Sequence, residues 1–202
     1  MIIQNKFQEN DLIDYNIDED YKIIPFSELK PLIDVLPRNS NKRIALLWLI
    51  FTGARVCEIE NRNINEIIFG KYWVWQPRKK QTKMRKEKLP LFFWEEFSYY
   101  LDNAKFNNKD IFGLKGESLS RQFNRDIRKK LGGNWIKKKP QFKSDGTYNL
   151  VYIYQLKNIR HNFVTYQMFK ELQKEMGPEV ALGRVSIRMC HSSKHITTTH
   201  YI

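Results

Sequence analysis

The longest apolar run of the chain, IALLWLIF at residues 44–51, is followed at once by a threonine and a glycine. Four of its side chains recur at the spacing of one helical face: Ile44, Leu47, Trp48 and Phe51. This pattern predicts a buried helix over residues 41–52, which Gly53 ends because glycine readily takes up the left-handed backbone that closes a helix. The run is far shorter than the roughly 18 residues that a membrane span needs. It therefore predicts a core helix of a soluble protein.

The hydrophobic period changes along the chain. Helical spacing begins near Pro25, with Ser27 as the expected N-cap, and a further helix is expected to start near Arg55. Aromatic and β-branched residues around Gly70, a very basic turn and the sequence KLPLFF then predict two or three short strands. Helical patterns return in residues 94–104, 118–133, 154–177 and 178–191, and residues 134–149 are expected to form a loop or hairpin. The predicted fold class is mainly α with a small antiparallel β-sheet (α+β).

The charge of the chain is strongly basic and unevenly distributed. The formal net charge is +13, but residues 1–22 carry six acidic and two basic side chains, so the remainder holds about +17. Such a surplus favours a polyanionic partner, because lysine and arginine release condensed counterions when they contact phosphates. A ribosomal or membrane-surface protein would share this trait. We expect residues 1–22 to be an acidic, flexible arm and residues 23–202 to form one folded domain.

The remaining composition excludes several classes of protein. There are two cysteines, Cys57 and Cys190, and no recognisable signal peptide, which favours the reducing cytoplasm over a secreted disulfide scaffold. The chain has no glycine-rich phosphate loop, which argues against a protein driven by nucleotide hydrolysis.

Three stretches far apart in the sequence carry side chains suited to phosphate chemistry. They read FTGARVCEIENRNINEI from Phe51, LKNIRHNF from Leu156 and CHSSKHITTTHY from Cys190. Arg55 and Arg160 supply planar, permanent charges, which clamp phosphate oxygens bidentately as lysine does not. The last stretch adds a phenol, Tyr201, which is one residue from the end of the sequence.

In this order the three stretches resemble the motifs of the tyrosine recombinase (phage integrase) family. The matching residues are Thr52, Gly53, Arg55 and Glu58 in the first box, Lys157, Arg160 and His161 in the second, and His191 and Tyr201 in the last. The resemblance covers roughly residues 22 to 202 and implies the catalytic-domain fold of that family. It leaves no room for the N-terminal core-binding domain that most members carry, so we expect that domain to be absent.

The resemblance implies a DNA strand transferase that needs neither metal nor ATP. Tyr201 would attack a DNA phosphorus and form a covalent 3′-phosphotyrosine, which preserves the bond energy for resealing. Arg55 and Arg160 would hold the non-bridging oxygens, and His191 and Lys157 would hydrogen-bond the phosphate or relay its proton. The expected partners are double-stranded DNA and further copies of the chain, as a tetramer on paired sites.

The family also uses a lysine on a β-hairpin as the acid for the leaving 5′-oxygen. Lys83 fits best, because KMRKEKLPL is similar to the Lys-x-x-Lys-Glu-Arg sequence that precedes Pro-Leu in the family. Lys80 is the alternative, because the length of the hairpin leaves the register open. Neighbouring basic residues are expected to contact the DNA backbone: Lys79, Lys80, Arg85 and Lys86.

Each motif also has a simpler interpretation. Arg55 could pair with Glu58 on one helical turn, and KNIRHN could be a plain basic helix face, with His161 as a hydrogen-bonded structural residue. Cys190, His191 and His195 could bind zinc only with another ligand, Cys57 or His200, at no recognised spacing.

The sequence departs from the pattern of the family in its last two boxes. Cys190 stands where glycine is usual, the interval from His191 to Tyr201 is one residue longer than is typical, and Lys157 replaces the commoner histidine. Two alternative functions are compatible with the same residues. One is a type IB topoisomerase activity, and the other is that of an accessory protein that binds DNA with the same fold but no longer cleaves it.

Overall fold

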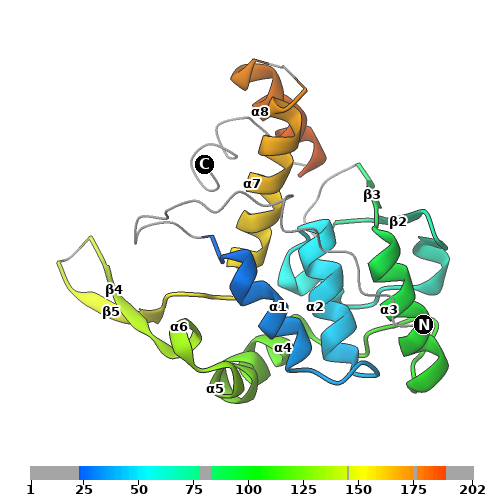
Figure 1. Cartoon of the computed structure of the whole chain (residues 1–202), viewed down its shortest axis with the longest axis horizontal. Coiled ribbons are helices and arrows are strands. Elements are labelled where there is room, and N and C mark those ends of the chain that lie inside the picture. Colours follow the sequence, from blue (N-terminus) through cyan, green and yellow to red (C-terminus); the bar gives the residue numbers. More distant parts are fainter. Residues whose placement is uncertain (1–22, 78–82, 145, 175–176, 190–202) are drawn as a thin grey trace.

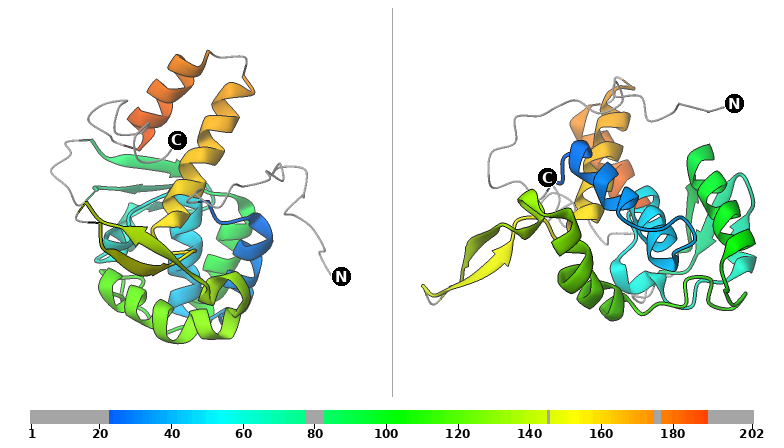
Figure 2. Two further views of the ribbon diagram at one scale, coloured as in Figure 1. Left: turned by 90° about the vertical axis from the view of Figure 1, so that its left-hand side faces the viewer. Right: turned by 60° about the horizontal axis from the view of Figure 1, so that its bottom comes forward.

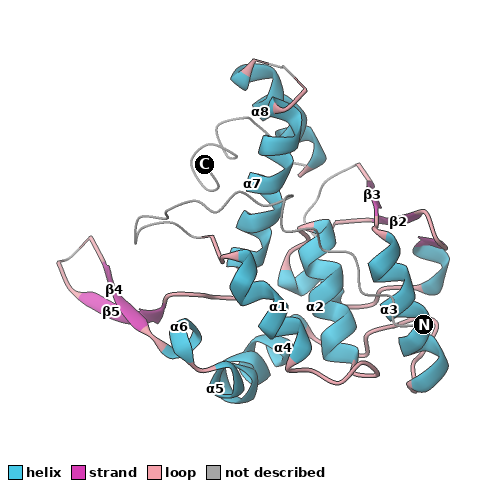
Figure 3. Cartoon of the chain, in the orientation of Figure 1, coloured by secondary structure: helices cyan, strands magenta, loops and turns pink. Residues whose placement is uncertain are grey.

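The structure is a computed structural model and describes residues 23–77, 83–144, 146–174 and 177–189 (Figure 1). Helices make up most of this part of the chain, and the strands form a three-stranded and a two-stranded antiparallel sheet (Figure 3). The predicted fold class, mainly α with a small antiparallel sheet, is confirmed.

The first two helices are α1 (Phe26–Asp34) and α2 (Asn41–Thr52). The bounds of α2 match the prediction, because a hydroxyl cap and a glycine fix its two ends: the Ser40 Oγ accepts a hydrogen bond from the amide of Lys42, and Gly53 closes the other end. The prediction of Ser27 as an N-cap was wrong. Pro25, with φ −55° and an extended ψ, precedes the helix, and Ser27 lies inside its first turn.

The helix expected near Arg55 is a single 3₁₀ turn, η2 (Val56–Ile59), followed by a second short turn, η3 (Ile64–Glu66). The first turn ends at Glu60, whose backbone is extended with ψ 138°, and Asn61 after it adopts a left-handed backbone with φ 56°. Three strands follow, β1 (Ile67–Ile68), β2 (Tyr72–Trp75) and β3 (Arg85–Lys88), paired in the order β1-β2-β3. The strands around Gly70 were predicted, but β3 lies within the run assigned to a basic turn. The predicted strand KLPLFF was wrong: Pro90, which has no amide N–H to pair in a sheet, directly precedes a helix that begins at residue 91.

Helix α3 (Leu91–Asn103) follows the sheet, and aromatic side chains fill the core between them and α2. The rings in mutual contact are Trp48, Trp73, Trp75, Phe93, Phe97 and Phe112. Both tryptophans of β2 are fully buried because they occupy alternate positions on one face of the strand.

The middle of the chain forms a separate group of short elements. These are α4 (Gly116–Gln122), the π-helical turn η4 (Phe123–Ile127), α5 (Arg128–Leu131), α6 (Gly133–Ile136), β4 (Lys138–Phe142) and β5 (Tyr148–Tyr152). The β4–β5 hairpin resolves the alternative left open by the sequence and projects from the body of the molecule (Figures 1 and 2). Arg128 anchors its base between the rings of Phe123 and Tyr152. Burial lowers the pKa of Arg128 to about 10, so the guanidinium stays charged at neutral pH.

The last two described helices, α7 (Asn158–Leu172) and α8 (Pro178–Arg188), pack against each other and rise from the rest of the molecule (Figure 2). Between them lies a small apolar cluster of Phe163, Val164, Val185 and Met189, separate from the main core. The N-terminal part of α7 packs against α2 and so connects this helical pair to the core. Within the described ranges, every helix is too short or too polar to cross a membrane.

Candidate active site

A tight turn at the end of α2 fixes the first motif. The Thr52 hydroxyl donates to the carbonyl of Trp48 at 2.6 Å and accepts from the amide of Ala54 at 3.2 Å. The amide of Gly53 donates to the carbonyl of Leu49 at 2.9 Å, with φ 58° at the glycine. These bonds set the direction in which the chain leaves the helix toward Arg55.

Gly53 also allows helix α7 to approach the end of α2 closely. A Cβ added at Gly53 would lie 2.3 Å from Cδ1 of Phe163, which is far inside van der Waals contact. Glycine is therefore required at this position for two reasons, the left-handed backbone and the missing side chain.

Arg160 extends from the first turn of α7 to the turn at Gly53. Its side chain is buried, and its Nη1 donates to the carbonyl of Gly53 at 2.6 Å, while Nη2 donates to the carbonyl of Met189 at 3.5 Å. Gly53 and Arg55 are two residues apart, so their Cα atoms are separated by at most about 7.6 Å. The structure thus brings the arginines of the first two motifs to one turn, although 107 residues separate Gly53 from Arg160.

Arg55 lies directly after this turn and is held by a buried carboxylate. Its Nη1 is 3.1 Å from Oε1 of Glu58, whose other oxygen accepts from the Trp75 indole at 3.3 Å. The side chain of Arg55 is 28% exposed, whereas that of Glu58 is 1% exposed. The Arg55–Glu58 pair offered by the sequence as a simpler interpretation is therefore formed. Because a guanidinium has five N–H donors, the same side chain remains able to bind a phosphate.

Glu58→Ala is expected to lower the free energy of unfolding by about 1–3 kcal/mol, because the buried indole N–H of Trp75 loses its acceptor. Arg55 would also lose the partner that holds its side chain in place. Urea unfolding followed by circular dichroism measures the loss.

Glu66→Ala is the matched control, since Glu66 accepts from the Trp73 indole at 3.1 Å and pairs with Arg62 at 3.2 Å. Burial raises the pKa of the Glu66 carboxyl, which means that its charged form is held at a cost, and its side chain is 19% exposed. We expect a smaller loss for Glu66→Ala than for Glu58→Ala. An equal or larger loss would show that Glu58 contributes no more to the free energy of unfolding than Glu66 does.

Three of the predicted lysines fall within the described residues. Lys157 is exposed and immediately precedes α7, and Lys83 is exposed just before β3. Lys86 is exposed, and its Nζ lies 4.0 Å from the centre of the Tyr72 ring. Lys79 and Lys80 fall outside the described residues. The catalytic and DNA-contact roles of the lysines stay predictions.

The predicted contact of Arg85 with DNA stays a prediction, because its side chain is buried in this structure. Arg85 is 3% exposed, and its guanidinium donates to the carbonyls of Thr52 and Gly53 and to Glu87. Its guanidinium also lies 4.6 Å from the centre of the Trp75 ring. A phosphate could reach Arg85, like the similarly buried Arg160, only after some of these carbonyl contacts had broken.

Sequence reasoning also missed Glu87 and Arg188, which bind each other next to Arg85. Strand alternation could have indicated part of this cluster. Arg85 and Glu87 share the face of β3 that points inward, and the intervening Lys86 points outward.

The third motif lies outside the described residues, and so do all of its predicted site residues. These are Cys190, His191, His195, His200 and Tyr201. The zinc interpretation therefore stays untested at those positions. Among the residues that the structure does describe, no group of three His, Cys, Asp or Glu side chains could hold a metal ion. His161 is buried, as expected for a structural residue.

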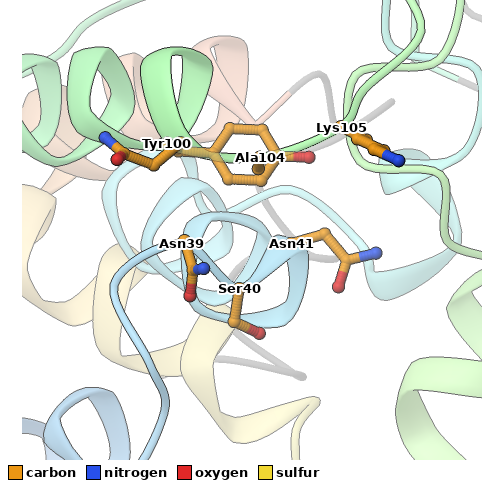
Figure 4. A pocket seen from close by; sticks show the side chains of 7 residues that line it. Asn39, Ser40, Asn41, Tyr100, Ala104 and Lys105 are labelled. Carbon is orange, nitrogen blue, oxygen red and sulfur yellow. The ribbon is translucent and has the colours of Figure 1, made fainter.

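A polar hollow lies at the opposite end of α2, with Asn39, Ser40 and Asn41 on one side and Tyr100, Ala104 and Lys105 on the other (Figure 4). The rise of an α-helix places it about 18 Å from Gly53. It is therefore no part of the arginine site, by which we mean the turn at Gly53 together with Arg55 and Arg160. The hydroxyl of Tyr100 donates to the carbonyl of Ile111 at 2.8 Å and leaves no unsatisfied group directed into the hollow from that ring.

Comparison with solved structures identifies the fold. The chain superposes on a XerA recombinase with a TM-score of 0.63 and 19% identity, covering 89% of this chain and 59% of the recombinase. It superposes on the Tn1549 transposon integrase in complex with circular intermediate DNA with a TM-score of 0.59 and 15% identity, covering 97% of this chain and 67% of the integrase.

A third match is the XerH site-specific recombinase bound to its palindromic difH substrate, with a TM-score of 0.57 and 14% identity. It covers 90% of this chain and 49% of XerH, so the chain spans only about half to two thirds of these proteins. The sequence matches no protein-family model and no curated protein. The architecture of this chain is that of the tyrosine recombinase catalytic domain.

Proposed function

We propose that the protein cleaves and rejoins DNA strands as a site-specific recombinase or integrase, through a covalent 3′-phosphotyrosine at Tyr201. One observation carries the proposal. Arg160 donates a hydrogen bond to the carbonyl of Gly53, two residues before Arg55, so arginines from two distant motifs lie at one turn. Two arginines that start from one turn suit a phosphodiester whose oxygens gain negative charge during attack.

The proposed reaction forms one bond and breaks one. The phenolic oxygen of Tyr201 bonds to phosphorus, and the bond from phosphorus to the 5′-oxygen breaks. Arg55 and Arg160 stabilise the charge on the non-bridging oxygens, Lys157 is a further hydrogen-bond donor, and His191 accepts the proton that the phenol loses as its oxygen bonds to phosphorus. The hairpin lysine, Lys83 or Lys80, gives its proton to the leaving oxygen, and resealing reverses each transfer.

Double-stranded DNA is the proposed partner. The net charge of +13 supports it, and so do the solved structures of Tn1549 integrase and XerH, which are complexes with DNA. We further propose that the active form is a tetramer on paired sites. A monomer in the absence of DNA would be compatible with this assembly.

Covalent trapping tests the proposed function. Duplexes that bind the protein are first selected from a randomised library at low salt, and the selected sequence is then made with a nick close to the scissile bond. Cleavage releases a short strand, which cannot religate, and the protein stays attached to the DNA. The wild type is expected to form this adduct and Tyr201→Phe is expected to form none, because the attacking oxygen is missing. DNA binding without an adduct in the wild type would refute the enzyme and support an accessory protein.

A supercoiled plasmid separates the two enzymatic possibilities. A recombinase is expected to join two copies of the selected site and to need that site for cleavage. Relaxation of plasmids that lack the site would instead show a type IB topoisomerase activity.

A further inference from the structure

A buried carboxylate connects strand β3 to the end of helix α8. Glu87 is 1% exposed, and its Oε1 accepts from Nη2 of Arg85 at 3.0 Å. From the other side, Nε of Arg188 donates to Oε2 at 2.9 Å and to Oε1 at 3.2 Å, and Nη2 of Arg188 donates to Oε2 as well. Two guanidiniums from distant parts of the chain therefore share one carboxylate.

Arg188 occupies the last turn of α8, at the point where the chain leaves the helix. Its third donor group, Nη1, binds Oε1 of Gln167 on α7 at 2.6 Å. Among the residues that the structure describes, the apolar cluster that holds α8 consists of Phe163, Val164, Val185 and Met189, with Met168 at its edge. With so little apolar surface, the polar contacts at the end of α8 carry much of its attachment to the body of the molecule.

The same cluster is continuous with the arginine site. Arg85 donates to the carbonyls of Thr52 and Gly53, and Gly53 also accepts from Arg160. A path of direct hydrogen bonds therefore runs from Arg188 through Glu87 and Arg85 to the turn that precedes the first catalytic arginine. His191 follows Arg188 by only three residues in the sequence.

We infer that Arg188 is a positioning residue, which ties the end of α8 to the arginine site through Glu87 and so sets where the residues after α8 begin. This inference rests on the proposed function, because those residues include His191 and the proposed nucleophile Tyr201. Arg188 itself does not contact the reacting phosphate. Its effect is exerted through the direction in which the chain leaves α8.

Arg184 provides a matched control one turn earlier on the same helix. Its Nη1 pairs with Glu171 of α7 at 3.3 Å, so it is held by a neighbouring helix and not by the carboxylate of β3. The hydrogen bond from Lys174, together with Arg184, keeps the pKa of the Glu171 carboxyl below its ordinary value, so this pair is also charged at neutral pH. The arginine side chain is 54% exposed in this pair and 36% exposed in the Arg188–Glu87 pair, and the carboxylates are 12% and 1% exposed.

The first test needs no DNA. Arg188→Met keeps an unbranched side chain beside the ring of Phe163 but removes the ion pair. Hydrogen–deuterium exchange of the full chain is expected to become about tenfold faster for amides of residues 181–189 in Arg188→Met, and to change less than threefold in Arg184→Met. Equal acceleration in both variants, or none in either, would overturn the inference.

The second test separates the nucleophile from the leaving group. The selected duplex is made with an ordinary 5′-oxygen and with a 5′-sulfur at the scissile bond, since a thiolate leaves without receiving a proton. Arg188→Met is expected to slow adduct formation about tenfold to a hundredfold on both substrates, because a displacement of about 1 Å of a reacting group costs rate on that scale. Arg188→Lys, which keeps one charged donor, is expected to recover part of the rate.

Each other outcome has a definite meaning. Rescue of Arg188→Met by the sulfur substrate would place its defect in the hairpin acid and refute a role at the nucleophile. The same slowing in Arg184→Met would reduce Arg188 to a general stabiliser of α8. Failure of the wild type to form an adduct would refute the proposed function, while the exchange experiment would still decide whether Arg188 anchors α8.

Discussion

Arg160→Lys is expected to slow formation of the covalent DNA adduct by about 10²–10³-fold, the cost of losing one preorganised donor at a developing negative charge. Lysine keeps the positive charge but cannot bind two oxygens in one plane, nor reach the carbonyl of Gly53 while it contacts a phosphate. The rate is measured from single-turnover time courses on the nicked substrate, at protein concentrations that saturate the DNA.

Arg43→Lys controls for the structural cost of replacing a buried arginine. Arg43 is 8% exposed, donates to the carbonyls of Ile33 and Leu36 and pairs with Glu96 at 2.8 Å, near the end of α2 away from Gly53. We expect Arg43→Lys to lower the unfolding temperature and to leave the rate per folded molecule within about threefold of the wild type. Equal losses of rate in both variants would mean that Arg160 acts through stability alone.

Gly53→Ala is expected to lower the free energy of unfolding by about 3 kcal/mol, as the sum of a left-handed backbone and an overpacked contact. The new Cβ would lie 2.3 Å from the ring of Phe163, and φ at this position is 58°. Because the clash pushes α7 away from α2, the variant is also expected to weaken the bond from Arg160 to the carbonyl of residue 53. Urea unfolding measures the first effect, and the adduct assay measures the second.

Gly70→Ala separates the two causes. Gly70 has φ 71°, and a Cβ added there meets no atom within 4 Å, so only the backbone cost of about 1 kcal/mol is expected. If Gly53→Ala lost no more stability than Gly70→Ala, the close approach of the two helices would not be a constraint on the fold.

The elements that the sequence predicted correctly are those whose signals are local. Helix α2 has its cap, its apolar face and its terminating glycine within fourteen consecutive residues, and its bounds agree with the prediction. Strand β2 is equally local, because its aromatic and β-branched residues are consecutive, whereas β3 lies in a basic run that was assigned to a turn. The helix expected near Arg55 is only one turn long because the backbone becomes extended at Glu60 and left-handed at Asn61, which its hydrophobic pattern does not reveal.

The contacts of the site were harder to predict from the sequence, because they join residues that are far apart in the chain. The motifs identified Arg55 and Arg160, but only packing of Phe163 against Gly53 explains how they meet. Arg85 was assigned to DNA because basic residues surround it, and only the structure shows that it lies on the buried face of β3 against Thr52 and Glu87. The partner of Glu87 lies 101 residues away, so neither periodicity nor composition could have indicated it.

The most direct test of the central claim is a structure of the protein with nicked duplex DNA and vanadate, which adopts the five-coordinate geometry of a phosphoryl transition state. The account predicts guanidinium nitrogens of both Arg55 and Arg160 about 2.7–3.1 Å from non-bridging oxygens of one vanadate, with the Tyr201 oxygen bonded to vanadium. Vanadate bound by only one of the two arginines, or joined to the DNA without Tyr201, would contradict it.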